Sequence, residues 1–159
     1  MTLYIKNKVL SLGGSTTVRD KEGNDLYFVK GAVFSPSKKK TIKDNSGKTR
    51  YVVKNRFFNF FSYCCYLYNG KGEKEMKITK KMFKGNKYYI EGYHSTLEID
   101  GDFFGYDFSV KRDGVEIGKV SRDVAFLDAF VLDAEKKEDA PLLIALVIAI
   151  DNIKDNIKK

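Results

Sequence analysis

The chain has 159 residues, a formal net charge of +8 and 43% hydrophobic residues, with an aromatic content of 14%. This hydrophobic and aromatic content excludes an intrinsically disordered chain, and the two prolines and 13 glycines exclude a collagen-like or low-complexity sequence. The two cysteines are adjacent, which excludes a disulfide scaffold and a zinc site built from four cysteines. The length predicts a single domain over residues 1–159.

The distribution of apolar residues bears on the location of the protein. Charged residues interrupt the first ten positions, so no secretory signal is indicated. The longest apolar run, Leu142 to Ile150, has nine residues. As a helix it would extend only ~14 Å, against the ~30 Å of a bilayer core. We therefore predict no transmembrane span and a cytoplasmic protein, with a peripheral membrane position as an option.

A repeated pattern covers most of the chain. An aliphatic anchor residue is followed by a polar residue and, four and five positions later, by an apolar pair, as in Val29-Lys30 with Val33-Phe34. Successive anchors are 21 to 25 residues apart, so six repeats fill residues 1–137. The anchors are Ile5, Val29, Val53, Ile78, Ile99 and Val120.

Each repeat is predicted to form two β-strands. Around the anchors, apolar and polar residues alternate with a period of two, which is typical of a strand with one buried face. The residue two positions before the anchor is apolar in five repeats, and Gly118 is the exception. Turn sequences such as Asp20-Lys-Glu-Gly23 and Asp44-Asn-Ser-Gly47 separate the strands. Six repeats give about twelve strands, a number at which an open sheet tends to curl or close.

The C-terminal segment, residues 138–159, breaks this rhythm. Asp139 before Pro141 suits the start of a helix, and the run from Leu142 has no polar face, so this helix must be buried all round. A sheet wrapped around it as a closed antiparallel barrel would achieve this, with Lys6, Lys30 and Lys54 facing water. The fold class is therefore mainly β with one central helix. The predicted helix core is Leu142, Leu143, Ile144, Leu146, Val147, Ile148 and Ile150.

Three segments carry a resemblance to a known family. The opening Tyr4 to Ser11, the stretch Leu97-Glu-Ile-Asp-Gly-Asp-Phe103 and the closing Ala145 to Asp151 resemble the LURP-one-related proteins. That family belongs to the Tubby C-terminal-like superfamily, as do the phospholipid scramblases. The resemblance implies a twelve-stranded barrel around a hydrophobic C-terminal helix. Tubby domains bind phosphoinositides through surface basic residues, but no matching motif carries those positions over to this chain.

The sequence offers little for catalysis. His94 is the single histidine, without a nucleophile motif or a second histidine for a metal, and an ordinary loop residue is the simpler interpretation. Cys64 and Cys65 should point to opposite faces of a strand, which favours packing over redox sensing. No phosphate-binding loop or dinucleotide motif is present. We predict no enzyme activity, no cofactor and no metal site.

Basic clusters are the first candidate for binding. Together with the net charge, they could attract an anionic membrane surface, although solvated lysines that keep the protein soluble are the alternative. Nucleic acid is not expected as a partner, because only five of the 29 basic residues are arginines and exposed stacking aromatic side chains would have to lie beside the lysines. The candidate residues are Lys38, Lys39, Lys40, Lys43, Lys80, Lys81, Lys84 and Lys87.

The aromatic third repeat is the second candidate. Between Phe57 and Tyr68, apolar or aromatic residues occupy both strand faces, so one face should form an outward patch unless loops cover it. The patch would comprise Phe57, Phe58, Phe60, Phe61, Tyr63 and Leu67. The leading hypothesis is a non-enzymatic module that recognises anionic phospholipid or a membrane surface. The alternative is a protein-interaction or structural module that forms a homodimer through this repeat.

Overall fold

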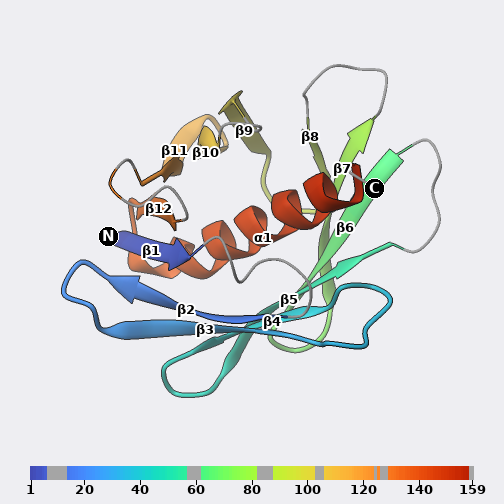
Figure 1. Cartoon of the computed structure of the whole chain (residues 1–159). Helices are drawn as coiled ribbons and strands as arrows, with labels where there is room; N and C mark the ends of the chain where they lie inside the picture. Colours follow the sequence, from blue (N-terminus) through green and yellow to red (C-terminus); the bar gives the residue numbers. More distant parts are fainter. Residues whose placement is uncertain are drawn as a thin grey trace.

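The computed structural model describes residues 1–6, 14–56, 62–81, 88–102, 106–123, 125 and 129–157. Within them the chain forms twelve strands and, after a short 3-10 helix (Lys137–Asp139), one long helix, α1 (Ala140–Ile157) (Figure 1). The strands are β1 (Thr2–Lys6), β2 (Ser15–Asp20), β3 (Asp25–Gly31), β4 (Lys40–Asp44), β5 (Thr49–Asn55), β6 (Ser62–Asn69), β7 (Lys74–Lys81), β8 (Tyr88–Glu91), β9 (Leu97–Asp102), β10 (Asp107–Arg112), β11 (Val115–Arg122) and β12 (Ala129–Ala134).

The strands form one antiparallel sheet in which all sequence neighbours except β8 and β9 are hydrogen-bonded, and β1 also pairs with β12. Ile5 of β1 is opposite Val18 of β2 on one side and Phe130 of β12 on the other. Each sequence repeat corresponds to two successive strands, from β1–β2 to β11–β12. The prediction of a twelve-stranded, mainly β fold is therefore confirmed.

The twelve strands form the predicted antiparallel barrel, which is nearly closed. The strand order begins at β8 and ends at β9, and the described residues include no hydrogen-bonded pairing between these two strands. Thr96, just before β9, accepts a hydrogen bond from the Asp113 N–H and donates its own N–H to the Asp113 carboxylate. These bonds hold the start of β9 against the β10–β11 turn, on the side away from β8.

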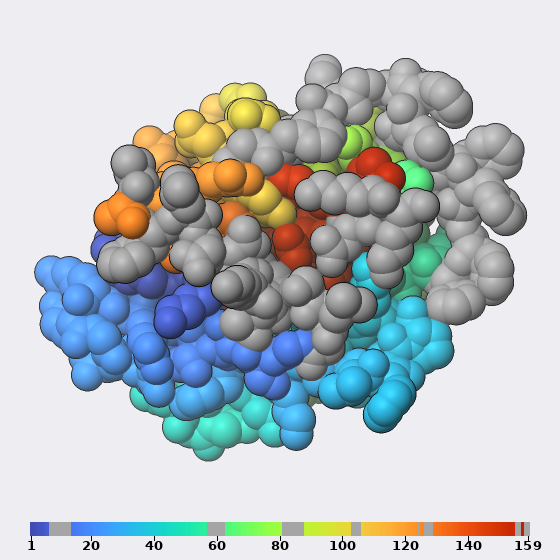
Figure 2. Space-filling model, in the orientation of Figure 1, coloured from blue at the N-terminus to red at the C-terminus, as the bar shows by residue number. Residues whose placement is uncertain are grey.

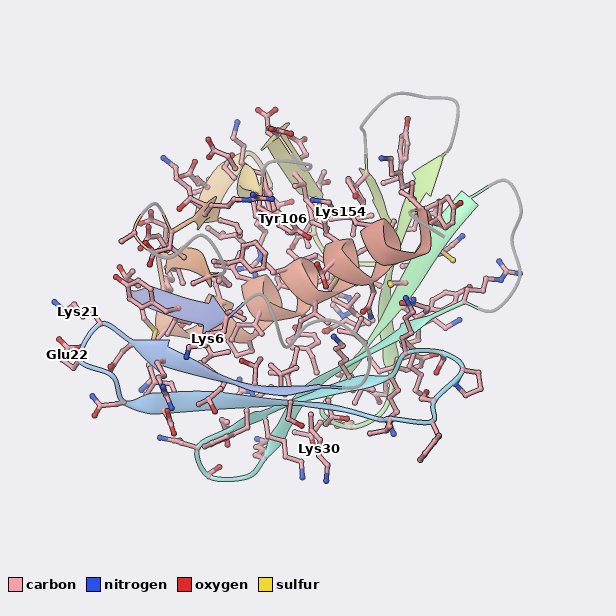
Figure 3. The ribbon with its side chains drawn as sticks, in the orientation of Figure 1. Lys6, Lys21, Glu22, Lys30, Tyr106 and Lys154 are labelled. Carbon is pink, nitrogen blue, oxygen red and sulfur yellow. The ribbon has the colours of Figure 1, made fainter. Side chains whose placement is uncertain are left out.

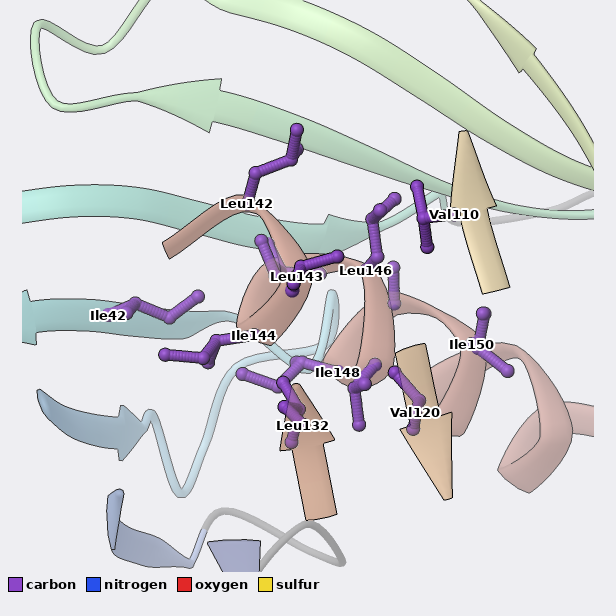
Figure 4. Close-up of a cluster of buried hydrophobic side chains, with 14 of the residues drawn as sticks. Ile42, Val110, Val120, Leu132, Leu142, Leu143, Ile144, Leu146, Ile148 and Ile150 are labelled. Atoms are coloured by element: carbon purple, nitrogen blue, oxygen red, sulfur yellow. The ribbon is translucent and has the colours of Figure 1, made fainter. Parts of the chain in front are cut away.

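Helix α1 runs through the barrel and fills it (Figure 1). Every residue from Ala140 to Ile150 is buried, and the predicted helix core residues are at most 3% exposed. In Figure 4 their side chains meet residues of the wall such as Ile42, Val110 and Leu132. Burial of each large aliphatic side chain contributes about 1.5–3 kcal/mol, so the helix and the inner faces of the strands stabilise one another. No helix among the described residues is long and apolar enough to cross a membrane.

The barrel has two different ends. Because neighbouring strands are antiparallel, the first strands of all six repeats finish at the same end, which we call the loop end. The apolar pair of each repeat follows that strand in the sequence. Turns that join successive repeats lie at the opposite, turn end. Helix α1 begins at the turn end and finishes at the loop end, where the Asn152 side-chain amide donates to the Lys38 carbonyl at 3.5 Å.

An ion pair fixes the helix at the turn end. Asp139, which precedes α1 as predicted, is buried, and its carboxylate lies 2.8 Å from the Arg112 guanidinium. Arg112 also donates to the Tyr93 hydroxyl at 3.2 Å. Burial by itself would lower the pKa of Arg112, but the hydrogen bond to Asp139 and the nearby charges outweigh it, so the pKa of Arg112 is raised. This pair ties the start of the helix to the end of β10.

Candidate functional site

The loop between β3 and β4 presents an apolar tip at the loop end. The Ser35 N–H donates to the Ala32 carbonyl at 3.1 Å, which closes a turn with Val33 and Phe34 at its centre. Val33 is 72% exposed and Phe34 is 96% exposed. Large apolar side chains are seldom so fully hydrated at the apex of a turn, so this tip is a candidate contact for an apolar or lipid phase.

Hydrogen bonds hold this loop in place. The Lys38 N–H donates to the Ser35 carbonyl at 3.0 Å, which makes a second turn, and the Ala32 N–H donates to the Lys39 carbonyl at 3.0 Å. The Asn55 N–H of β5 reaches the Ser37 carbonyl at 2.7 Å. Both sides of the loop are thus fixed to the barrel, and the tip is presented outward instead of folding back onto apolar surface.

Two of the predicted lysines are exposed on the β3–β4 hairpin, which lies at the surface of the molecule (Figure 2). Lys39 and Lys43 are exposed, as is Lys30 in β3 (Figure 3). Lys38 is half-buried and adopts a positive φ of 46°. Phe28, opposite Lys43 in the neighbouring strand, adds a further apolar side chain that is 42% exposed. The β3–β4 hairpin therefore combines an apolar tip with exposed cations.

Two other predicted lysines do not belong to this surface. Lys40 is only 2% exposed and Lys80 only 7%, because each lies on the inner face of its strand, in line with Ile42 and Ile78 respectively. Burial lowers the pKa of Lys80. Successive residues of a strand point to opposite faces, and Lys40 and Lys80 are each on the inward side. The side chain of Lys81 and all of Lys84 and Lys87 fall outside the described residues.

The aromatic patch predicted in the third repeat lies only partly within the described residues. Phe57, Phe58, Phe60 and Phe61 fall outside the described residues. Tyr63 packs against the core, and Leu67 is fully buried. Leu67 is therefore a core residue and not part of an outward patch, since it faces the helix side of β6. The outer face of β6 carries Tyr66 and Tyr68 instead.

Three buried polar residues contact one another at the last turns of α1. The Tyr106 hydroxyl donates to the Asp151 carboxylate at 2.6 Å, and the Lys154 ammonium lies 3.4 Å from the centre of the Tyr106 ring (Figure 3). All three residues are at most 7% exposed. Tyr106 thus hydrogen-bonds an acidic residue through its hydroxyl and contacts a basic residue through its ring. These contacts allow polar residues to be buried at the end of the helix.

The residues considered for catalysis or redox chemistry are Cys64, Cys65 and His94. Cys65 is fully buried and its thiol donates to the Asn55 side-chain oxygen at 2.8 Å, while Cys64 points to the other face of β6. Burial raises the pKa of both thiols, so neither is activated. His94 is exposed beside Tyr93, with ring centres 6.3 Å apart. In the parts of the chain that the structure covers, no three metal-binding side chains come together.

A cavity of about 810 Å³ lies against β1 and β2. Its cationic side chains are Lys6, Arg19 and Lys21 (Figure 3), but the Arg19 guanidinium is already 2.6 Å from Asp25. Asp20 and Asp123 add negative charge to the wall, so the cavity has no dominant sign. The lining residues are Tyr4, Ile5, Lys6, Ser15, Thr16, Thr17, Arg19, Asp20, Lys21, Gly23, Asp123 and Ala129.

The fold and sequence can now be compared with known proteins. The family model described as LURP-one-related matches residues 1–151. The chain belongs to the LURP-one-related family. A crystal structure of an Arabidopsis thaliana protein is similar, with a TM-score of 0.61 and 14% sequence identity over 99% of this chain and 92% of that chain. A search of curated proteins gave no match.

For this LURP-one-related protein, the similarity to the Arabidopsis structure establishes the fold alone, because the identity is 14%. Sequence reasoning missed the exposed tip, although Val33-Phe34 was visible as an apolar pair. The signal was its position: the pair falls after the first strand of its repeat, in the connection, where no core is available to cover it.

Proposed function

We propose that the protein is a non-enzymatic, cytoplasmic module that binds peripherally to membranes containing anionic phospholipid. The observation that carries this proposal is the β3–β4 tip, where Val33 and Phe34 are 72% and 96% exposed. The tip is fixed to the barrel by hydrogen bonds, and exposed Lys30, Lys39 and Lys43 lie on the same hairpin. Apolar insertion and attraction to anionic headgroups would act together.

The magnitudes are sufficient for reversible binding. Full burial of a phenylalanine or valine side chain contributes about 1.5–3 kcal/mol each. Each lysine near an anionic surface adds about 1 kcal/mol. Two apolar side chains and three lysines on one rigid loop and its strands thus supply enough free energy for a weak, salt-sensitive association. Because the loop is already ordered, little conformational entropy is lost when it inserts.

The test is co-sedimentation with vesicles. We expect the protein to bind vesicles containing phosphatidylserine, to bind neutral phosphatidylcholine vesicles much less, and to dissociate as salt is raised. Phe34→Ser should weaken binding about tenfold or more, from the loss of one buried aromatic side chain. Lys39→Glu should weaken binding to anionic vesicles only.

The matched control is Val115→Ser at the turn end. Val115 is 68% exposed, a fraction similar to that of Val33, but it lies in the β10–β11 hairpin at the other end of the barrel. This variant should bind as the wild type does. Equal binding to neutral and anionic vesicles, or an equal loss in Phe34→Ser and Val115→Ser, would contradict the proposal.

A further inference from the structure

The outer face of β5, β6 and β7 places two tyrosines between two basic strands. In the register of the sheet, Tyr66 of β6 lies opposite Lys54 of β5 and Lys77 of β7. Tyr68, the next outward residue of β6, lies opposite Lys74 of β7. Helix α1 packs on the inner face of these strands, so this outer face is not part of the core (Figure 1). We call these five residues the tyrosine–lysine face.

The cations contact the aromatic rings directly. The Lys54 ammonium lies 4.8 Å from the centre of the Tyr68 ring, and the Lys74 ammonium lies 4.4 Å from the centre of the Tyr66 ring. Both tyrosines are half-buried, since the lysine side chains cover part of each ring. Among the described residues, each tyrosine ring is thus in contact with a flexible lysine side chain.

The charge of this face is positive. Arg50 and Arg56 extend the basic residues along β5 and just beyond its end. Two acidic side chains contact these cations: Glu91 lies 3.4 Å from Lys77, which would exchange it for phosphate, and Asp44 lies 3.6 Å from Arg50. Lys54 and Lys74 instead lie against tyrosine rings. The face thus provides flat π surfaces bordered on both sides by mobile cations.

We propose that the tyrosine–lysine face binds single-stranded nucleic acid, with bases stacked on Tyr66 and Tyr68 and backbone phosphates held by Lys54, Lys74 and Lys77. Binding of nucleic acid through lysines needs exposed stacking aromatic side chains beside them. On this face lysines lie against two tyrosine rings, and both rings are half-buried with the lysines in place.

The competing interactions favour the bound state. An exposed cation–π contact changes an equilibrium constant by a factor of about two to five, and this factor is lost when a lysine leaves its ring. Stacking of one base on an aromatic side chain contributes a factor of about five to 150, and the displaced lysine gains a phosphate contact. Successive outward residues of a strand are ~6.7 Å apart, so the rings can receive neighbouring bases of an extended strand.

The face fits a single strand better than a duplex or a lipid surface. In a duplex the bases are stacked on each other and cannot lie on a tyrosine ring, so only phosphate contacts would remain. A lipid bilayer requires apolar side chains that project beyond the cations, whereas Tyr66 and Tyr68 are half-buried beneath theirs. The apolar tip at Phe34 belongs to a different hairpin, and this proposal does not depend on the membrane proposal.

The experiment measures fluorescence anisotropy of labelled oligothymidylate and oligouridylate of about 12 nucleotides, within the site size of a single nucleic-acid-binding barrel. We expect Tyr66→Ala and Tyr68→Ala each to weaken binding at least fivefold, and the corresponding phenylalanine variants to retain it. In Lys54→Ala, the slope of log K against log salt should fall by about 0.7, which corresponds to one phosphate contact.

Controls make each outcome decisive. Tyr4→Ala removes a half-buried tyrosine from the outer face of β1 and should leave binding unchanged; thermal unfolding establishes that the variants are folded. Phe34→Ser should also bind oligonucleotide normally. The proposal is overturned if the wild type does not bind single strands at low salt, if a duplex binds equally well, or if the tyrosine variants lose only vesicle binding.

Discussion

Replacement of Gly118 by alanine should destabilise the barrel. Gly118 lies in β11 between β10 and β12, at a position where the other repeats have larger, apolar residues. A Cβ added here would lie 2.4 Å from the Leu143 Cδ1 and 2.6 Å from the Asp133 carbonyl oxygen. The helix therefore passes so close to the wall at this point that only hydrogen fits.

The magnitude follows from these distances. Carbon atoms in contact are normally ~3.5–4.0 Å apart, so the helix side chain or the strand must move by more than about 1 Å. Overpacking of this kind costs about 1–3 kcal/mol, which corresponds to a fall in Tm of about 2–12 °C for a chain of this length. In a strand with free space, the same substitution would instead stabilise by roughly 0.5–1 kcal/mol.

Urea unfolding followed by circular dichroism measures the change in the free energy of unfolding. A double-mutant cycle with Leu143→Ala provides the control, because it removes the nearest clashing atom while the Asp133 carbonyl remains. We expect the cost of Gly118→Ala to be smaller in that background, with a coupling of about 0.5–3 kcal/mol. If Gly118→Ala is as stable as the wild type or more stable, the close approach of helix and wall is refuted.

Three further predictions concern charged and titratable groups. Arg112→Ala leaves the buried Asp139 carboxylate without its partner and should cost roughly 1–3 kcal/mol by urea unfolding, whereas Arg19→Ala, which breaks an exposed pair, should cost less than ~1 kcal/mol. The hydrogen bond from Ser46 is the main cause that lowers the pKa of Asp44. The stabilisation of the folded state by the ionised Asp44 is therefore present above the unfolded pKa of 3.8 and is lost as pH falls through the folded pKa. NMR titration of the Asp44 carboxyl carbon checks this, and a folded pKa at or above 3.8 would contradict it. Burial raises the pKa of the Cys65 thiol, so a thiol reagent should react only after unfolding, and rapid labelling of the native protein would disprove the enclosure.

The sequence was sufficient to predict the strands and their inner faces. Alternation with a period of two records which side of a strand is buried, and five of the six anchors, such as Val53 and Ile78, are at most 2% exposed. The helix was predictable for a related reason, since a run that is apolar on every side needs a complete enclosure. The exception to the pattern, Gly118, is explained only by the path of the helix, which local sequence does not record.

The candidate sites were less predictable because they depend on relations between strands. Lys40 follows Lys39 in the sequence, yet strand alternation sends it inward while Lys39 stays exposed. The exposure of Phe34 depends on hydrogen bonds across the loop and to β5, which the composition does not reveal. The contact between Lys54 and Tyr68 depends on the register of two strands, which the sequence alone does not give.

The position of the helix explains why the two candidate surfaces can change without loss of the fold. Because α1 occupies the interior, the inner side chains of the strands, such as Ile42 and Leu132, are committed to packing against it. Outward residues such as Tyr66, and loop residues such as Phe34, make few of these contacts. Substitutions that alter recognition should therefore change binding much more than unfolding free energy, whereas substitutions along the helix contact, such as Gly118→Ala, should do the reverse.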